Sequence, residues 1–197
     1  SALLFNTLYG GSSHAIGSPF EEIQYFEMLR DKRVDGCIIL GGQMDLDNPS
    51  EEYVRALDRL DLGLPVVAIG QPLAGCNCIF INRDLGGGVA SLIQHLVALG
   101  NRHIGFLGGQ QGIRQTTERL KVYRATLEAL QLPVSERLVA LSNYYTEDGY
   151  TGMRTLLAGG EKLDAVVAIN DPVAIGAIRA ICDAGLSVPG DIAVASC

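Results

Sequence analysis

The sequence lacks patterns that several common classes of protein require. It contains no cluster of Lys or Arg, and its formal net charge is −7. We therefore do not expect this chain by itself to bind nucleic acid, whose phosphates require a basic face. No segment approaches the ~18 uninterrupted apolar residues of a membrane-spanning helix, and no targeting segment is visible. A signal peptide that had already been removed would leave no trace, so secretion stays open.

Cysteine is present but in no zinc-binding pattern. Five cysteines occur, and none of them forms a C-x-x-C pair. Cys76 and Cys78 are one residue apart, whereas Cys37, Cys182 and Cys197 stand alone. We expect no zinc site. We interpret the cysteines as small buried hydrophobes in a reducing cytoplasm.

Catalytic and phosphate-binding motifs are also missing. The sequence has no G-x-S-x-G, no P-loop and no G-x-G-x-x-G, and its three histidines lie far apart. The stretch "RDLGGGVASLIQHL" is interpreted as a helix capped by Asp84 and packed closely on a sheet. No carboxylate pair suits acid–base work. We expect no enzyme, metal or cofactor; a nucleotide or sugar-phosphate hydrolase is a minor alternative.

What the sequence does contain is an alternation of apolar runs and helix-period segments, with 48% apolar residues. Unbroken runs rich in Val and Ile indicate parallel strands covered on both faces. Strands are predicted near residues 2–5, 34–40, 66–69, 78–81, 103–107, 138–141, 165–169 and 192–195. Helices are predicted near residues 20–29, 51–60, 89–97, 120–130, 150–157 and 174–181. The pattern predicts a doubly wound α/β fold. A Gly- and Gln-rich stretch at 108–112 suggests a boundary, which gives subdomains 1–109 and 110–197.

Asn170 and Asp171 occupy the end of a predicted buried strand, where ligands bind in open parallel sheets. Asp171 precedes Pro172, which is typical of a helix N-cap. We expect Asp171 chiefly to cap the helix and Asn170 to contact a polyhydroxyl ligand, with a turn hydrogen bond as the alternative for Asn170. This division of roles predicts that removing the Asp171 side chain lowers stability, whereas removing that of Asn170 weakens binding.

Arg119 and Tyr144 are further candidates. Arg119 lies near the start of a predicted helix, and its guanidinium suits carboxylates, phosphates or vicinal hydroxyls. The alternative is an exposed arginine paired with Glu118 or Glu128. Tyr144 follows a predicted strand and can either stack on a ligand or pack under a loop.

Several phrases resemble one family. "VDGCIIL", "LPVVAIG", "QHLVALGNRHIGFLGG", "ERLKVYRATLEAL" and "AVVAINDPVAIGAIRAICDAGLSVPGDIAV" occur in the order typical of the effector-binding core of LacI/GalR-type bacterial regulators. The resemblance spans nearly the whole chain. It implies the type I periplasmic-binding-protein fold, in which two Rossmann-like parallel-sheet subdomains enclose a ligand cleft.

The resemblance also implies a function and a set of site residues. The ligand would be a small effector, most simply a sugar, bound by Arg119, Asn170, Tyr144 and Gln115, with Asp171 beside them. The protein would be a cytoplasmic homodimer that binds operator DNA through an N-terminal helix-turn-helix. A periplasmic sugar-binding protein of a transport system, which shares the fold, is the main alternative.

The sequence departs from the family at both ends. The helix-turn-helix, the hinge helix and the first core strand do not precede "ALLFNT", and "PGDIAVASC" stops where family members continue with Gly-Phe-Asp-Asp. Val122 stands where a glycine is usual. We therefore expect a fold truncated at both ends, and this sequence to be part of a longer chain.

Overall fold

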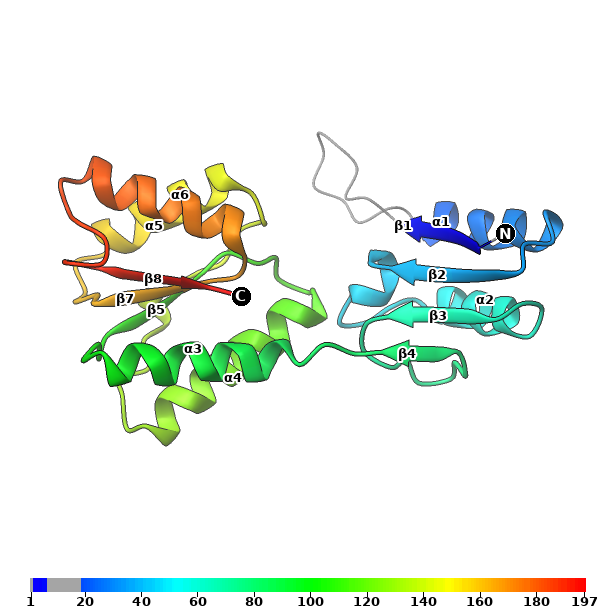
Figure 1. The fold of residues 1–197 in the computed structure, drawn as a ribbon, viewed down its shortest axis with the longest axis horizontal. Coiled ribbons are helices and arrows are strands. Elements are labelled where there is room, and N and C mark those ends of the chain that lie inside the picture. Colours follow the sequence, from blue (N-terminus) through cyan, green and yellow to red (C-terminus); the bar gives the residue numbers. More distant parts are fainter. Residues whose placement is uncertain (1, 7–18) are drawn as a thin grey trace. The chain divides into compact units, whose positions relative to one another are not determined.

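The computed structural model describes residues 2–6 and 19–197 and shows an α/β protein. The chain divides into two compact units, Ser1–Arg83 and Asp84–Cys197 (Figure 1). Each unit has its own parallel sheet and its own apolar core. The predicted α/β fold class with parallel sheets is confirmed.

The first unit is built on a parallel sheet of order β1-β2-β3-β4. Its elements are β1 (Ala2–Asn6), α1 (Pro19–Asp31), β2 (Gly36–Leu40), the 3₁₀ helix η1 (Gly42–Asp45), α2 (Glu51–Asp61), β3 (Val66–Ile69) and β4 (Ile79–Ile81). Helices α1 and α2 pack side by side against the sheet (Figure 1). The rings of Phe26 and Tyr53 meet between them, with centroids 5.5 Å apart.

A buried carboxylate ties α1 to the segment that follows β2. Both carboxylate oxygens of Glu22 accept the backbone N–H of Gln43, at 3.0 and 3.2 Å. Burial of Glu22, aided by the charge of Asp45, raises the pKa of its carboxyl to about 7 although the hydrogen bond from Gln43 opposes the shift. Glu22 therefore fixes the start of η1 against the first turn of α1.

The second unit has a parallel sheet of order β6-β5-β7-β8. Its elements are α3 (Leu85–Ala98), β5 (Ile104–Leu107), α4 (Arg114–Ala129), the 3₁₀ helix η2 (Glu136–Leu138), β6 (Val139–Ala140), α5 (Thr146–Ala158), β7 (Ala165–Ala168), α6 (Asp171–Asp183) and β8 (Ala193–Ser196). Helices α3 and α4 cover one face of this sheet, and α5 and α6 cover the other (Figure 1). Every residue of β5 and β7 is buried, as expected of central parallel strands.

The division between the units lies earlier in the sequence than the predicted boundary between residues 109 and 110. Segment 84–109, which the sequence analysis placed in the first subdomain, carries α3 and β5. Strand β5 pairs with β6 and β7, and α3 packs on α4, so both belong to the second sheet. The glycine-rich stretch after β5 is a loop at the edge of this sheet.

The predicted elements agree with the structure in number and order. Over the described residues, each of the eight predicted strand segments contains or overlaps a strand, and each of the six predicted helix segments overlaps a helix. Asp84 caps α3 as predicted, because its Oδ1 accepts the N–H of Gly87 at 2.8 Å. The interpretation of all the cysteines as buried is wrong for Cys182 and Cys197, which are exposed.

Two glycines allow α5 and α6 to touch through their backbones. A Cβ added to Gly149 would lie 2.1 Å from the carbonyl oxygen of Val173, and one added to Gly176 would lie 1.9 Å from that of Thr146. Only hydrogen fits at either position. The contact brings the first turns of α5 and α6 side by side, and with them the residues that immediately precede each helix.

We expect Gly176→Ala to lower the free energy of unfolding by about 3 kcal/mol, because the new methyl group overlaps a backbone carbonyl that cannot move independently. The matched control is Gly88→Ala in α3, where an added Cβ meets only Cys197, at 3.8 Å. That substitution should be neutral or stabilise the protein by up to about 1 kcal/mol through helix propensity. Urea unfolding followed by circular dichroism measures both; similar losses in the two variants would contradict the contact.

Candidate functional site

The carboxyl edge of the second sheet gathers the loops that follow its strands. After β5, Gly108 donates its N–H to the carbonyl of Ala140, and Gly109 donates to that of Asn143, each at 2.9 Å. Ser142 donates back to the carbonyl of Gly109 at 3.1 Å. Both glycines have φ of +86°, a conformation that side chains disfavour. The loops after β5 and β6 are thus hydrogen-bonded to each other. Together they form a rim, at residues 108–109 and 140–143, along the edge where open parallel sheets bind ligands.

Arg119 reaches this edge from α4. The residue is only 7% exposed, so the alternative of a solvent-exposed arginine is wrong. One Nη donates to the carbonyl of Ile169, at the end of β7, at 2.9 Å. A buried guanidinium held by a backbone carbonyl is a fixed cation at the sheet edge, because arginine keeps its charge when buried.

Tyr144 lies on the loop between β6 and α5. Its ring packs against the apolar core of the second unit. Its hydroxyl lies 2.9 Å from the hydroxyl of Thr116, a buried residue in the first turn of α4. The ring of Tyr144 therefore packs in the fold, as the alternative prediction stated. The ring is half-buried and lies next to the rim formed by the loops after β5 and β6.

Asn170 connects the ends of two elements. Its Oδ1 accepts the N–H of Val173 at 3.0 Å, so Asn170 is the N-cap of α6. Its Nδ2 donates to the carbonyl of Tyr144 at 3.0 Å. The side chain thus joins the start of α6 to the loop that leads into α5.

The prediction that Asp171 caps α6 is wrong. The cap is Asn170, and Asp171 is the first residue of the helix. The order Asn-Asp-Pro places Pro172 in the first turn whichever residue caps the helix, so the proline could not decide between them. Asn170 has the extended backbone conformation typical of an N-cap, with φ −162° and ψ 172°.

Asp171 and the end of β8 supply the outermost polar groups. Asp171 is exposed, and its carboxylate accepts a short hydrogen bond from the hydroxyl of Ser196. Cys197 follows. Cys197 as a whole is exposed, but partial burial of its thiol raises its pKa, the charge of Arg119 lowers it, and that of Asp171 raises it further. Arg119 and Asp171 therefore both lie close enough to Cys197 for their charges to act on its thiol.

Four of the five predicted site residues lie near one another at this edge. Arg119 binds the carbonyl beside Asn170, Asn170 binds Tyr144, and Asp171 follows Asn170 in the chain. Gln115 lies half-buried in the first turn of α4, next to Thr116. Sequence reasoning missed Thr116 and Ser196. The position of Ser196 at the end of an apolar run was a usable signal, whereas nothing local distinguishes Thr116.

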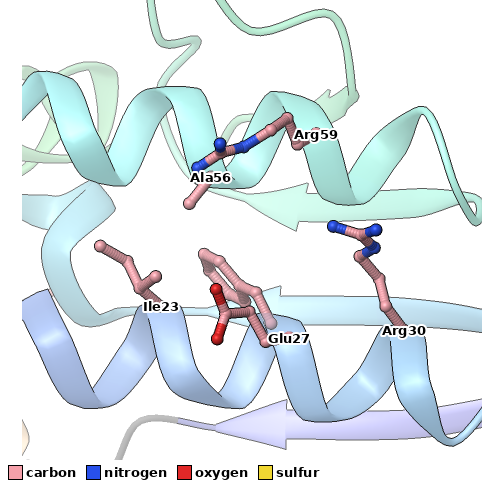
Figure 2. Close-up of a pocket in the computed structure, with 6 residues that line it drawn as sticks. Ile23, Glu27, Arg30, Ala56 and Arg59 are labelled. Carbon is pink, nitrogen blue, oxygen red and sulfur yellow. The ribbon is translucent and has the colours of Figure 1, made fainter.

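Hollows also lie away from this edge. One, of about 470 Å³, lies on α5, is open to solvent and is lined by Thr151, Arg154, Thr155, Ala158 and Gly159. A pocket between α1 and α2 is lined by Ile23, Phe26, Glu27, Arg30, Ala56 and Arg59 (Figure 2). Its volume of about 80 Å³ is below the ~300–1,000 Å³ of ordinary ligand pockets. Within residues 2–6 and 19–197, no group of three or more His, Cys, Asp or Glu side chains could hold a metal ion. In the same residues, no helix combines the length and apolarity needed to cross a membrane.

Comparison with known proteins places this edge in a wider context. Residues 93–197, which include the whole candidate site, match the family described as "Periplasmic binding protein-like domain". Catabolite control protein A of Staphylococcus xylosus is 29% identical over 184 residues, covering 93% of this chain and 53% of that protein. The transcriptional regulator CelR of Thermobifida fusca is 32% identical over 168 residues, covering 84% of this chain and 47% of that protein. The chain spans about half the length of the curated relatives it matches.

Solved structures give the same result. A sugar-binding transcriptional regulator of the LacI family from Escherichia coli, in complex with phosphate, superposes with a TM-score of 0.78 at 27% identity, covering 90% of this chain and 62% of that one. The complex of CelR with cellobiose superposes with a TM-score of 0.75 at 31% identity, covering 90% of this chain and 53% of that one.

We expect Asn170→Ala to lower the free energy of unfolding by about 2 kcal/mol, through loss of the cap and of the bond to Tyr144. Asn170→Asp keeps the acceptor that caps α6 but lacks the Nδ2 donor, so it should lose about half as much. Asp171→Ala should cost about 0.5 kcal/mol, from the favourable charge at the helix start. Equilibrium denaturation of the three variants tests this order, and a larger loss for Asp171→Ala than for Asn170→Ala would contradict it.

Proposed function

Because the chain belongs to the periplasmic binding protein-like family, in the form found in LacI-type transcriptional regulators, we propose that it is the effector-binding and dimerisation part of such a regulator. The ligand is a small polar molecule, and a sugar fits best. The observation that carries the proposal is the set of polar groups held at the carboxyl edge of the second sheet, where Arg119 donates to the carbonyl of Ile169 and Asn170 donates to that of Tyr144.

The proposed roles follow from the chemistry of each group. Arg119 supplies a fixed cation with a planar fork of donors, suited to vicinal hydroxyls. Asp171 supplies exposed acceptor oxygens for sugar hydroxyls, and the ring of Tyr144 offers an apolar surface for the face of a sugar ring. Gln115 adds an adaptable amide from the first turn of α4. Asn170 fixes the loop of Tyr144 to the start of α6 and lies beside the bound ligand.

In the longer protein, ligand binding would shift the equilibrium between two conformations of the sensor. The ligand needs a different affinity for each conformation, and coupling of this kind is typically about 1–3 kcal/mol. The shift would alter how two DNA-binding heads engage an operator. This chain carries no basic cluster for that task, so we assign DNA binding to a helix-turn-helix outside the given sequence.

The alternatives have less support. A transport receptor shares the fold, but the relatives and neighbours named above are transcriptional regulators, which also favours a cytoplasmic location. Those proteins are regulators rather than enzymes, and we propose no catalytic role. CelR was solved with cellobiose, and the Escherichia coli regulator is described as sugar-binding, which favours a carbohydrate ligand here.

We also propose that the chain associates with a second copy of itself through α6. This helix exposes Ile175 (59%) and Ile178 (38%) one turn apart, with the exposed Cys182 one turn further on. Apolar side chains at such spacing form a stripe that a second copy would cover.

Arg119→Lys should weaken sugar binding about tenfold to a hundredfold, because an ammonium keeps the charge but not the fork that Ile169 positions. A thermal-shift screen of the chain against common mono- and disaccharides would select the ligand, and calorimetry would give the affinities. Arg124→Lys on the same helix is the matched control, since Arg124 pairs with Glu136 on the surface. The proposal fails if no sugar raises the melting temperature, or if both lysine variants bind like the wild type.

Ile175→Lys should raise the dissociation constant of the homodimer at least about tenfold, because it places a charge in the proposed interface. Leu99→Lys, at an equally exposed apolar position after α3, should leave it unchanged. Sedimentation velocity over a range of concentrations separates these results. A wild-type chain that stays monomeric throughout would refute the proposed interface.

A further inference from the structure

The first unit holds a close pair of thiols that the proposed function does not use. The Sγ atoms of Cys76 and Cys78 lie 3.3 Å apart in the turn between β3 and β4. A disulfide requires about 2 Å between sulfurs, so the two atoms need to approach by only about 1 Å. This distance is short enough for a small adjustment of the turn to join them.

The turn itself is held in place around the pair. Asn77, between the two cysteines, donates both its backbone N–H and its side-chain amide to Oδ1 of Asp58, at 3.3 and 3.2 Å. The N–H of Cys76 donates to the carbonyl of Leu73 at 3.3 Å, and Gly75 takes φ +85°. Cys78 leads directly into β4. These hydrogen bonds therefore hold the backbone of the turn in a conformation that places the two thiols next to each other.

The two thiols differ in their surroundings. Cys78 is only 6% exposed, and burial raises the pKa of its thiol further than the neighbouring Cys76 and Asp61 do. Cys76 is half-buried and can be reached from solvent. The accessible Cys76 sulfur is thus the group that meets an oxidant first, and the buried Cys78 sulfur is placed to react with the product.

Metal binding explains the pair less well. Thiolate metal sites use four ligands in structural centres, or three and an open position in catalytic ones. In the part of the chain that the structure describes, no third His, Cys, Asp or Glu completes such a group around Cys76 and Cys78. Cys78 is buried in the core of the first unit, and Cys76 packs against that core while remaining half-buried, so packing alone does not explain why the two sulfurs face each other at 3.3 Å.

We propose that Cys76 and Cys78 form a two-electron redox site that closes to a disulfide on reaction with hydrogen peroxide and is reopened by a dithiol reductant. The Cys76 thiolate attacks one peroxide oxygen, the O–O bond breaks, and a sulfenic acid and one water form after proton transfer. The Cys78 sulfur then attacks the Cys76 sulfur and displaces a second water, which takes the sulfenic hydroxyl and the thiol proton. The two thiols lose two electrons and two protons, and the peroxide is reduced to two waters.

Closure of this disulfide would act on the turn that joins β3 to β4. The residue pairs Val67–Ile79 and Ile69–Ile81 hold β4 at the edge of the first sheet. A covalent bond between residues 76 and 78 restricts the turn at the point where it enters β4. Oxidation would therefore alter how firmly β4 is held at the edge of the first sheet. This effect would require no ligand at the second unit.

The test treats the whole chain with hydrogen peroxide and follows the intact mass and the peptide that contains both residues 76 and 78. We expect that peptide to lose two hydrogens, two free thiols to disappear, and dithiothreitol to reverse both changes. Cys182→Ser together with Cys197→Ser removes the exposed thiols and should leave the reaction unchanged. These readouts require no effector, so they are independent of the proposed sensor function.

Two further variants define the mechanism. Cys76→Ser should leave Cys78 unmodified, because the remaining thiol is buried. Cys78→Ala, which keeps a small apolar group in the core, should stop reaction at a Cys76 sulfenic acid that a dimedone probe labels. The proposal is overturned if the wild-type peptide gains oxygen without losing hydrogens, if oxidation yields only dimers linked through Cys182 or Cys197, or if Cys76→Ser loses hydrogens as the wild type does.

Discussion

The backbone contact between α5 and α6 is the constraint on which the candidate site depends. Gly149 and Gly176 let the two helices approach until each meets the other's carbonyl oxygen, and no side chain fits between them. This contact fixes where the two helices begin. Because the helix starts are close together, the single side chain of Asn170 can both cap α6 and bind the loop that carries Tyr144. Without the glycines the helices would stand further apart, and one asparagine could not span them.

Much of the fold was predictable from the sequence because the spacing of apolar residues indicates which faces of each helix and strand are buried. Strands such as β5 and β7 are covered on both faces, so their residues are uniformly apolar, and the helices show one apolar stripe. The boundary between units was not predictable in the same way. A Gly-rich stretch marks any sharp turn, and the stretch at 108–112 turns at a sheet edge whereas the division follows Arg83.

The strand end that carries Asn170 could be predicted from the sequence, but the residue that caps the helix that follows could not. Asn170 was recognised because it ends a buried run, but the choice between Asn170 and Asp171 as the cap depends on backbone angles that Asn-Asp-Pro leaves open. Arg119 could not be recognised as buried from its surroundings in the sequence, because its partner is the carbonyl of Ile169, fifty positions away. Thr116 escaped notice for the same reason, since its partner is Tyr144.

The double engagement of Asn170 has a consequence for redesigning ligand preference. Both polar atoms of its amide bond to the scaffold, so a library that varies this position would mostly sample destabilised chains. Asp171 is exposed and accepts a hydrogen bond from the half-buried Ser196, and neither side chain caps α6. Randomising those neighbours while keeping the asparagine would let new specificities emerge on an unchanged framework.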